Sequence, residues 1–327
     1  MTTSALRNQG GTAMSQLRLG VIGIGAFGAR VALRLLWSGY HTLSIYDVAD
    51  VATRLFTNDY GGMALGSPKM MAQTCDIVIT VLPSAAELRE VCFGWEGVAE
   101  GFAEDGIVLD LGTTDPVATA ELAKDLAARG IDLVAAPAFG TPTEAKEGKL
   151  TLVVGGVEAA VARCRPVLDT LATRVLTAGA AEAAQAAGAI ADFLRGARLL
   201  AAAEAIRLGQ RYGFEPAAVV SLGDELGGDV GETVRRDLVT RAFKSGRQLG
   251  LLRRNIALAA RLAAATDTRS PLIEATLAAW TDAENAIGYG ADHTAVIKWL
   301  EALPGLASAA APDQDQNLEP VESPPTG

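Results

Sequence analysis

The sequence predicts an α/β domain followed by an all-α domain, that is, an N-terminal Rossmann-type doubly wound sheet and then a helical domain. Apolar strand segments alternate with helical stretches in the first half of the chain, and strand signals vanish from about residue 179, where an Ala-rich helical stretch begins. We expect a flexible leader at 1–16, the Rossmann domain at 17–178, a helical substrate and dimerisation domain at 179–305, and a disordered acidic tail at 306–327.

A glycine-rich turn follows the first predicted strand. The apolar run Leu19–Ile22 enters Gly23-Ile24-Gly25-Ala26-Phe27-Gly28, a helix follows through residues 31–37, and a second strand at 41–46 ends in Asp47. Gly23 permits the tight turn, Gly25 lets a pyrophosphate approach the backbone N–H groups at the helix start, and Gly28 lets helix and strand pack closely. The spacing therefore predicts a dinucleotide-binding site.

Asp47 predicts which dinucleotide binds. Its carboxylate can accept hydrogen bonds from both ribose hydroxyls of an adenosine, and its charge would repel a 2′-phosphate. Val48 and Ala49 follow directly and offer no cation for such a phosphate, although Arg54 lies farther along. We expect NAD as the cofactor, with NADP left open by Arg54.

Composition argues against several other classes of function. The net charge of −10 disfavours nucleic-acid wrapping, and no apolar run reaches the roughly 18 to 20 residues of a membrane span. Cys75, Cys92 and Cys164 lack metal-like spacing and their odd count suits a reducing cytosol, while His41 and His293 are too few for a histidine-based metal site or a Ser-His-Asp triad. We expect a cytoplasmic protein with a small-molecule substrate and no metal, nucleic-acid or membrane partner.

The order of motifs resembles the β-hydroxyacid dehydrogenase family, which includes 3-hydroxyisobutyrate dehydrogenases. The resemblance covers nearly the whole chain, from Leu17 to about Leu303, and its motifs are the following: Gly20–Gly28, Val81-Leu82-Pro83-Ser84, Asp110–Pro116, Ala136-Pro137 through Gly148–Thr151, and Ala291–Ala295. It implies a homodimer or larger oligomer, and hydride transfer between a nicotinamide and a small hydroxy acid or carbonyl compound. It also places Leu82 and Pro83 among the cofactor-binding residues.

The chain departs from the family pattern at three chemical positions. Gly188 stands where the family usually has a proton-exchanging lysine, and Ala191 and Asp192 stand at its Asn pair. The Ser-Gly-Gly of the substrate loop, which usually holds a carboxylate, becomes Phe139-Gly140-Thr141, and a later Lys-Asp pair becomes Arg254-Asn255. These departures predict a changed substrate or reaction.

Asp192 is the acid nearest to the vacant lysine position and shares a helical face with Gly188. We expect it to deliver a proton if Ile190, Phe193 and a bound nicotinamide desolvate it. The alternative is an ordinary exposed ion pair with Arg195, three residues on. Gly188 itself predicts room for a ligand or for another backbone, because glycine within a helix costs about 1 kcal/mol relative to alanine.

Three further residues have predicted roles in the site. Thr113 ends a strand near the expected nicotinamide and could orient substrate, Phe139 favours an apolar group in the pocket, and Arg254 could hold an anionic substrate or the cofactor. We expect His293 to be a loop or helix-cap residue. Two other functions stay open: an imine reductase, whose family shares this architecture, and a catalytically weak dinucleotide-binding sensor or scaffold.

Overall fold

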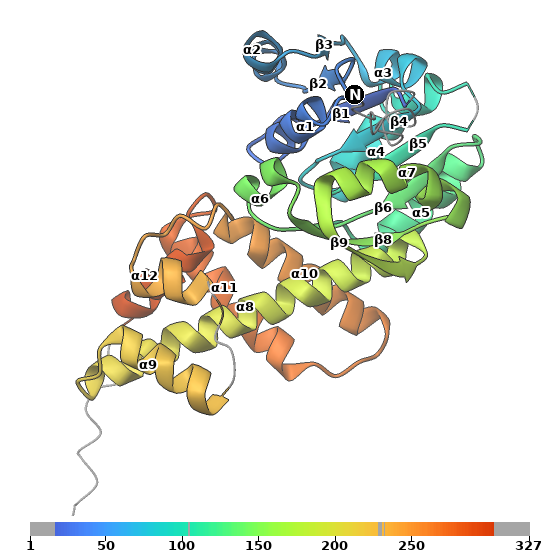
Figure 1. Ribbon diagram of the computed structural model, residues 1–327. Coiled ribbons are helices and arrows are strands. Elements are labelled where there is room, and N and C mark those ends of the chain that lie inside the picture. The colour runs from blue at the N-terminus through green and yellow to red at the C-terminus, as the bar shows by residue number, and fades with distance from the viewer. Residues whose placement is uncertain (1–16, 104, 228–230, 232, 304–327) are drawn as a thin grey trace, which may run out of the picture.

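The computed structural model describes residues 17–103, 105–227, 231 and 233–303, so the predicted leader and tail lie outside the described part. Figure 1 shows a sheet flanked by helices and, beside it, a bundle of helices. The long helix α8 (Ala181–Arg211) runs from the sheet into the bundle and belongs to both parts.

Nine strands of the described residues form one sheet in the order β3-β2-β1-β4-β5-β6-β8-β7, with β9 paired to β8. The strands from β3 to β6 are parallel, whereas β8 runs antiparallel to β6 and β7. Their bounds are β1 (Leu19–Ile22), β2 (Ser44–Tyr46), β3 (Met63–Ala64), β4 (Ile77–Thr80), β5 (Ile107–Asp110), β6 (Asp132–Ala135), β7 (Ala138–Phe139), β8 (Leu150–Gly155) and β9 (Ala172–Gly179). The chain order reverses between β1 and β4, which is where doubly wound sheets bind ligands.

Several strands differ from the sequence-based expectation, which did not include the two-residue strands β3 and β7. The predicted strand at 41–46 is shorter, because Leu43 N donates to Tyr40 O in a turn and pairing begins at Ser44. The strand β9 was not expected, since most of its side chains are exposed and show no apolar alternation. It pairs with β8 at the border of the sheet.

Apolar side chains cover both faces of the sheet. Val31, Leu35 and Val167 belong to the core on one face, and Met71, Leu88 and Leu122 to the core on the other. The helices of this part are α1 (Gly28–Trp37), α2 (Asp50–Tyr60), α3 (Pro68–Thr74), α4 (Ala85–Phe93), η2 (Val98–Glu100), α5 (Pro116–Ala127), α6 (Pro142–Glu147) and α7 (Glu158–Leu171).

The helical part packs around α8. Trp280 is fully buried and donates its Nε1–H to Gly196 O at 3.2 Å. A Cβ at Gly196 would lie 2.5 Å from Ile256 Cδ1, so this glycine allows the close approach of α8 and the helix that carries Ile256. The other elements are α9 (Pro216–Leu222), η3 (Gly223–Gly227), η4 (Val234–Val239), α10 (Leu249–Ala265), α11 (Pro271–Ile287), η5 (His293–Ala295) and α12 (Val296–Ala302). In the described part of the chain, no helix has the length and apolar character needed to cross a membrane.

Candidate active site

The glycine-rich turn joins β1 to α1 with the geometry that the motif predicts. Gly23 adopts a φ of 95°, and a Cβ there would lie 2.3 Å from Val81 O. A Cβ at Gly28 would lie 1.9 Å from Gly23 O, whereas nothing lies within 4 Å of the same position at Gly25. Gly23 and Gly28 therefore close the turn, and Gly25 leaves the open approach that a pyrophosphate needs.

Asp47 closes the other side of this turn. Its Oδ2 accepts from Ile24 N at 2.7 Å, and its Oδ1 accepts from Ala49 N at 2.8 Å. The carboxylate thus lies against the glycine-rich loop, as expected of an acid that meets the adenosine ribose. These residues fit a bound dinucleotide.

Asp110 ends β5 at the same edge of the sheet and is buried. Its Oδ1 accepts from Thr80 Oγ1 at 2.9 Å and from Gly112 N at 3.2 Å. Gln185 of α8 donates to Asp110 Oδ2 at 3.2 Å and accepts from Thr114 N at 2.9 Å. Burial raises the pKa of Asp110 to about 6. The start of α8 is therefore bonded to the turn after β5.

The structure brings Gly188, Thr113 and Arg254 together. A Cβ at Gly188 would lie 3.3 Å from Thr113 Cγ2 and 3.2 Å from Pro137 Cβ. Arg254 of α10 donates from Nη2 to Thr113 O at 3.2 Å, and burial lowers its pKa. Three residues predicted separately thus meet where α8 and α10 reach the carboxyl edge of the sheet.

Asp192 lies one turn after Gly188 and is 1% exposed. Its oxygens accept from Arg195 Nη1 at 3.0 Å, Arg247 Nη1 at 3.2 Å and Asn255 Nδ2 at 2.7 Å. The pair with Arg195 is present, but its carboxylate is buried, whereas the Arg195 side chain is 32% exposed. The expectation that Ile190 desolvates this acid is wrong, because Ile190 is 48% exposed.

These contacts bear on what Asp192 can do. Both oxygens already accept N–H bonds, two of them from guanidinium groups and one from an amide. Its catalytic role stays a prediction. The arrangement favours a carboxylate that fixes two arginine side chains.

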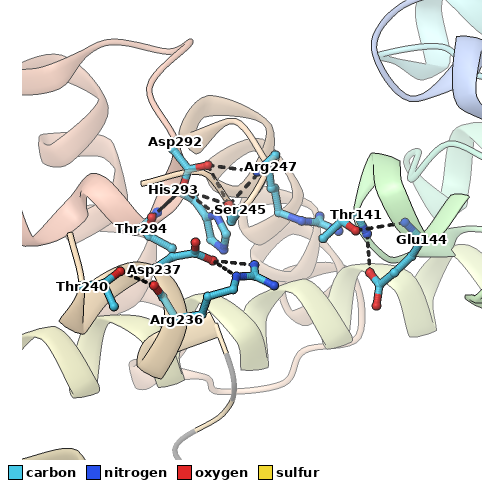
Figure 2. Close-up of polar contacts among 11 residues, drawn as sticks. Thr141, Glu144, Arg236, Asp237, Thr240, Ser245, Arg247, Asp292, His293 and Thr294 are labelled. Atoms are coloured by element: carbon cyan, nitrogen blue, oxygen red, sulfur yellow. Dashed lines mark hydrogen bonds and ion pairs between the residues drawn. The ribbon is translucent and has the colours of Figure 1, made fainter. Parts of the chain in front are cut away.

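The predicted substrate loop follows β7. The Arg195 guanidinium carbon lies 5.6 Å from the centre of the Phe139 ring. Gly140 has a φ of 154° and packs against Leu150. Thr141 begins α6 with a capping box, in which its Oγ1 accepts from Glu144 N at 3.2 Å and its N donates to Glu144 Oε2 at 2.7 Å (Figure 2). A substrate role for Thr141 and Gly140 stays a prediction, since the Thr141 hydroxyl already serves the helix start.

Arg247 is the site residue that the sequence analysis missed. Its backbone N donates to Ser245 Oγ at 3.3 Å, and its carbonyl accepts from His293 N at 2.9 Å. Ser245 Oγ in turn bonds Asp292 Oδ2 at 2.8 Å and His293 Nδ1 at 2.8 Å (Figure 2). His293 is thus buried in a packing segment that opens η5. No local motif marks Arg247, because its place is set by long-range contacts such as the bond from His293 N and the pairing of Gln248 with Asp292.

Metal ligands do not gather in the described residues, where no group of three or more His, Cys, Asp or Glu side chains could hold an ion. Cys75, Cys92 and Cys164 are buried and free.

Comparisons with known proteins agree with this geometry. The family profile of the NAD binding domain of 6-phosphogluconate dehydrogenase matches residues 18–179. The profile described as NAD-binding of NADP-dependent 3-hydroxyisobutyrate dehydrogenase matches residues 182–300. The mitochondrial 3-hydroxyisobutyrate dehydrogenase of Homo sapiens is 33% identical over 208 residues, which span 64% of this chain and 61% of that protein. The 2-(hydroxymethyl)glutarate dehydrogenase of Eubacterium barkeri is 28% identical over 296 residues, 89% of this chain and 97% of that protein.

Solved structures share the two-part fold. The 3-hydroxyisobutyrate dehydrogenase of Salmonella typhimurium superposes with a TM-score of 0.75 at 26% identity, covering 86% of this chain and 99% of that one. An imine reductase of Streptomyces aurantiacus has the same fold, with a TM-score of 0.59 at 16% identity over 87% of this chain and 99% of that one. A dinucleotide-binding sheet joined by one long helix to a helical domain defines a class of two-domain NAD(P)-binding proteins. Within that class, this chain belongs to the β-hydroxyacid dehydrogenase family.

Proposed function

We propose that the protein is an NAD(P)-dependent oxidoreductase of the 3-hydroxyisobutyrate dehydrogenase type, acting on a small hydroxy acid or the corresponding carbonyl compound. The main support is the meeting of Thr113, Gly188 and Arg254 at the carboxyl edge of the sheet, the edge that also carries the glycine-rich turn. When bound, the nicotinamide supplies or accepts the hydride.

The chain's own residues hold the cofactor. The N–H groups of the turn from Gly23 to Gly28 receive the pyrophosphate, and Leu82 and Pro83 flank it after β4. Asp47 accepts from the adenosine ribose and disfavours a 2′-phosphate. NAD is therefore the proposed cofactor, with NADP as its alternative.

Thr113 and Asp192 carry the remaining polar roles of the proposed site. The Thr113 hydroxyl orients the substrate oxygen or a water that exchanges the proton. Asp192 acts as a positioning residue, because its contacts with Arg195 and Arg247 fix both guanidinium groups. Phe139, Gly140 and Thr141 line the substrate end of the site.

Turnover assays separate this function from its two alternatives. The purified protein is mixed with NADH or NAD and a panel of 3-hydroxy acids, their semialdehydes and cyclic imines. Oxidation of hydroxy acids or reduction of semialdehydes supports the proposal, whereas reduction of the imines alone indicates an imine reductase. Tight NADH binding without turnover on any substrate indicates a sensor or scaffold. Imine reduction is included because the chain shares its fold with imine reductases and lacks the lysine that is usual in its family.

A dimer or larger oligomer in the cytosol completes the proposal. The Ala-rich helix α8 presents small residues on more than one face, which suits close approach by a partner helix. Three free buried cysteines suit a reducing compartment. A single 33.8 kDa species in sedimentation at micromolar concentration would contradict the oligomer.

A further inference from the structure

We propose that Arg195, stacked on Phe139 and paired across Asp192 with Arg247, binds the acid group of the substrate. The enzyme would then select small alcohols and carbonyl compounds that carry an oxyanion. This inference rests on the proposed function and assigns its substrate-recognition residue. The family's Ser-Gly-Gly loop usually holds a carboxylate, but this chain has Phe139 at the serine position. Arg195 would supply an anion-binding group in its place.

Arg195 lies at the right place on α8. It follows Gly188 by seven residues, so the two share one face of the helix, with their Cα atoms about 10 Å apart along the axis. Helical side chains lean toward the N-terminus, and the Arg195 guanidinium accordingly bonds Asp192 on the preceding turn, four residues after Gly188. Its 5.6 Å distance to the Phe139 ring places it at the substrate loop.

Arg195 and Arg247, which we call the arginine pair, have N–H donors that Asp192 does not use. Each guanidinium has five N–H groups. In the described part of the chain, Arg195 and Arg247 each donate side-chain bonds from Nη1 alone, to Asp192. Among the described residues, the only fully buried side-chain N or O atoms without a hydrogen-bond partner are the hydroxyl oxygens of Tyr40 and Thr53. The spare nitrogens of the arginine pair therefore reach solvent-accessible space, where an oxyanion can accept two parallel bonds.

Charge at the arginine pair also favours an anion. The side chains of Arg195 and Arg247 are 32% and 16% exposed, and they share the single carboxylate of Asp192. Glu144 is the other carboxylate that acts on Arg195, and it accepts from Thr141 N. Burial and then Arg247 lower the pKa of Arg195 to about 10, so it stays charged at neutral pH. A bound oxyanion relieves the repulsion between the two cations.

Calorimetric titration of the full-length, NADH-saturated protein tests the assignment. The probes are 3-hydroxypropanoate, 2-hydroxyethanesulfonate and 2-hydroxyethylphosphonate, with uncharged 1,3-propanediol as the neutral analogue. Arg195→Gln should raise the dissociation constants of the oxyanions by about tenfold or more, the loss expected for a charge-assisted bond. The affinities for NADH and propanediol should not change. Arg195→Lys should restore part of the loss, and Arg211→Gln, an exposed change on the same helix, should have no effect.

The outcomes separate this inference from the proposed function. Unchanged oxyanion affinity in Arg195→Gln, or no oxyanion binding by the unaltered protein, overturns the arginine assignment, whatever the turnover assays show. Arg195-dependent oxyanion binding without hydride transfer to any substrate supports the assignment and contradicts the oxidoreductase. The probe that binds most tightly identifies the acid group as carboxylate, sulfonate or phosphonate. An equal loss for propanediol in both Arg195 variants would also overturn the inference.

Discussion

Asp192 Oδ2 accepts a hydrogen bond of 2.7 Å from Asn255 Nδ2, which joins α8 to α10 inside the site. The family pattern has an Asn at the position of Asp192 and an Asp at the position of Asn255. The chain therefore carries the same acid and amide in exchanged places. Two departures that look independent along the sequence are one complementary pair in space, which explains how both can occur in one folded site.

The exchanged pair predicts rescue by reciprocal substitution. Asp192→Asn leaves the arginine pair without its anion, and Asn255→Asp sets two carboxylates in contact, so each single variant should lower the free energy of unfolding. The double variant restores one acid and one amide. We expect a coupling free energy of about 1 to 3 kcal/mol from a double-mutant cycle in urea. Strictly additive effects would contradict the pairing.

Asp192→Asn should also lower activity. Loss of the carboxylate frees Arg195 and Arg247 from their fixed positions, so kcat should fall by about tenfold or more while NADH affinity stays unchanged. Steady-state kinetics with the best substrate of the panel, together with NADH fluorescence titration, measures both. Near-normal turnover would mean that Asp192 serves stability alone.

Restoring a lysine at position 188 should raise activity toward 3-hydroxy acids. General acid–base catalysis contributes about 10² to 10⁴ in rate, and the new side chain would start from a Cβ that lies 3.3 Å from Thr113 Cγ2. Gly188→Ala is the matched control, because it adds the same Cβ, 3.2 Å from Pro137 Cβ, without the amine. Equal rates for both variants would show that the site no longer holds a hydroxy acid at that position.

Asp47→Asn should weaken the preference for NADH over NADPH. The substitution removes the charge that repels a 2′-phosphate and keeps an oxygen for the bond from Ile24 N. We expect the ratio of the two dissociation constants to change by about tenfold, which corresponds to about 1.4 kcal/mol. Fluorescence titration of both cofactors measures it. Tighter NADPH binding by the unaltered protein would overturn the NAD assignment.

Asp110 should make stability depend on pH. Its pKa rises from 3.8 to about 6 in the folded protein, mainly through burial. Between pH 3.8 and about 6, the unfolded chain loses the Asp110 proton that the folded chain keeps. The free energy of unfolding is therefore highest below pH 4 and falls as pH rises through 6. The loss should be on the order of 2 to 3 kcal/mol.

The comparison variant is Asp110→Asn, which cannot ionise. It should be less stable than the unaltered protein at pH 7, because its amide would face the Gln185 Nε2–H₂ donor. Its stability should nevertheless vary less between pH 4 and 7. Urea unfolding at a series of pH values measures this, and parallel profiles for the two proteins would contradict the assignment to Asp110.

The sequence determined the features that depend on local geometry. The turn from Gly23 to Gly28 follows from glycine's freedom at positive φ and from its missing Cβ, and Asp47 follows from the end of the adjacent parallel strand. The family resemblance placed Gly188 at the vacant lysine position, and the structure sets it against Thr113. The glycine turn and Asp47 are fixed by short spacings within one unit of the fold, whereas the contact of Gly188 with Thr113 depends on the packing of α8 against the sheet.

Only the tertiary structure decided what surrounds Asp192. Asn255 is 63 residues away along the chain and Arg247 is 55, and Arg247 lies in a non-helical segment just before α10. Likewise β9 is an exposed strand that only its pairing with β8 defines. The burial and charge partners of a side chain depend on how helices pack, and packing joins residues whose separation in the sequence carries no signal.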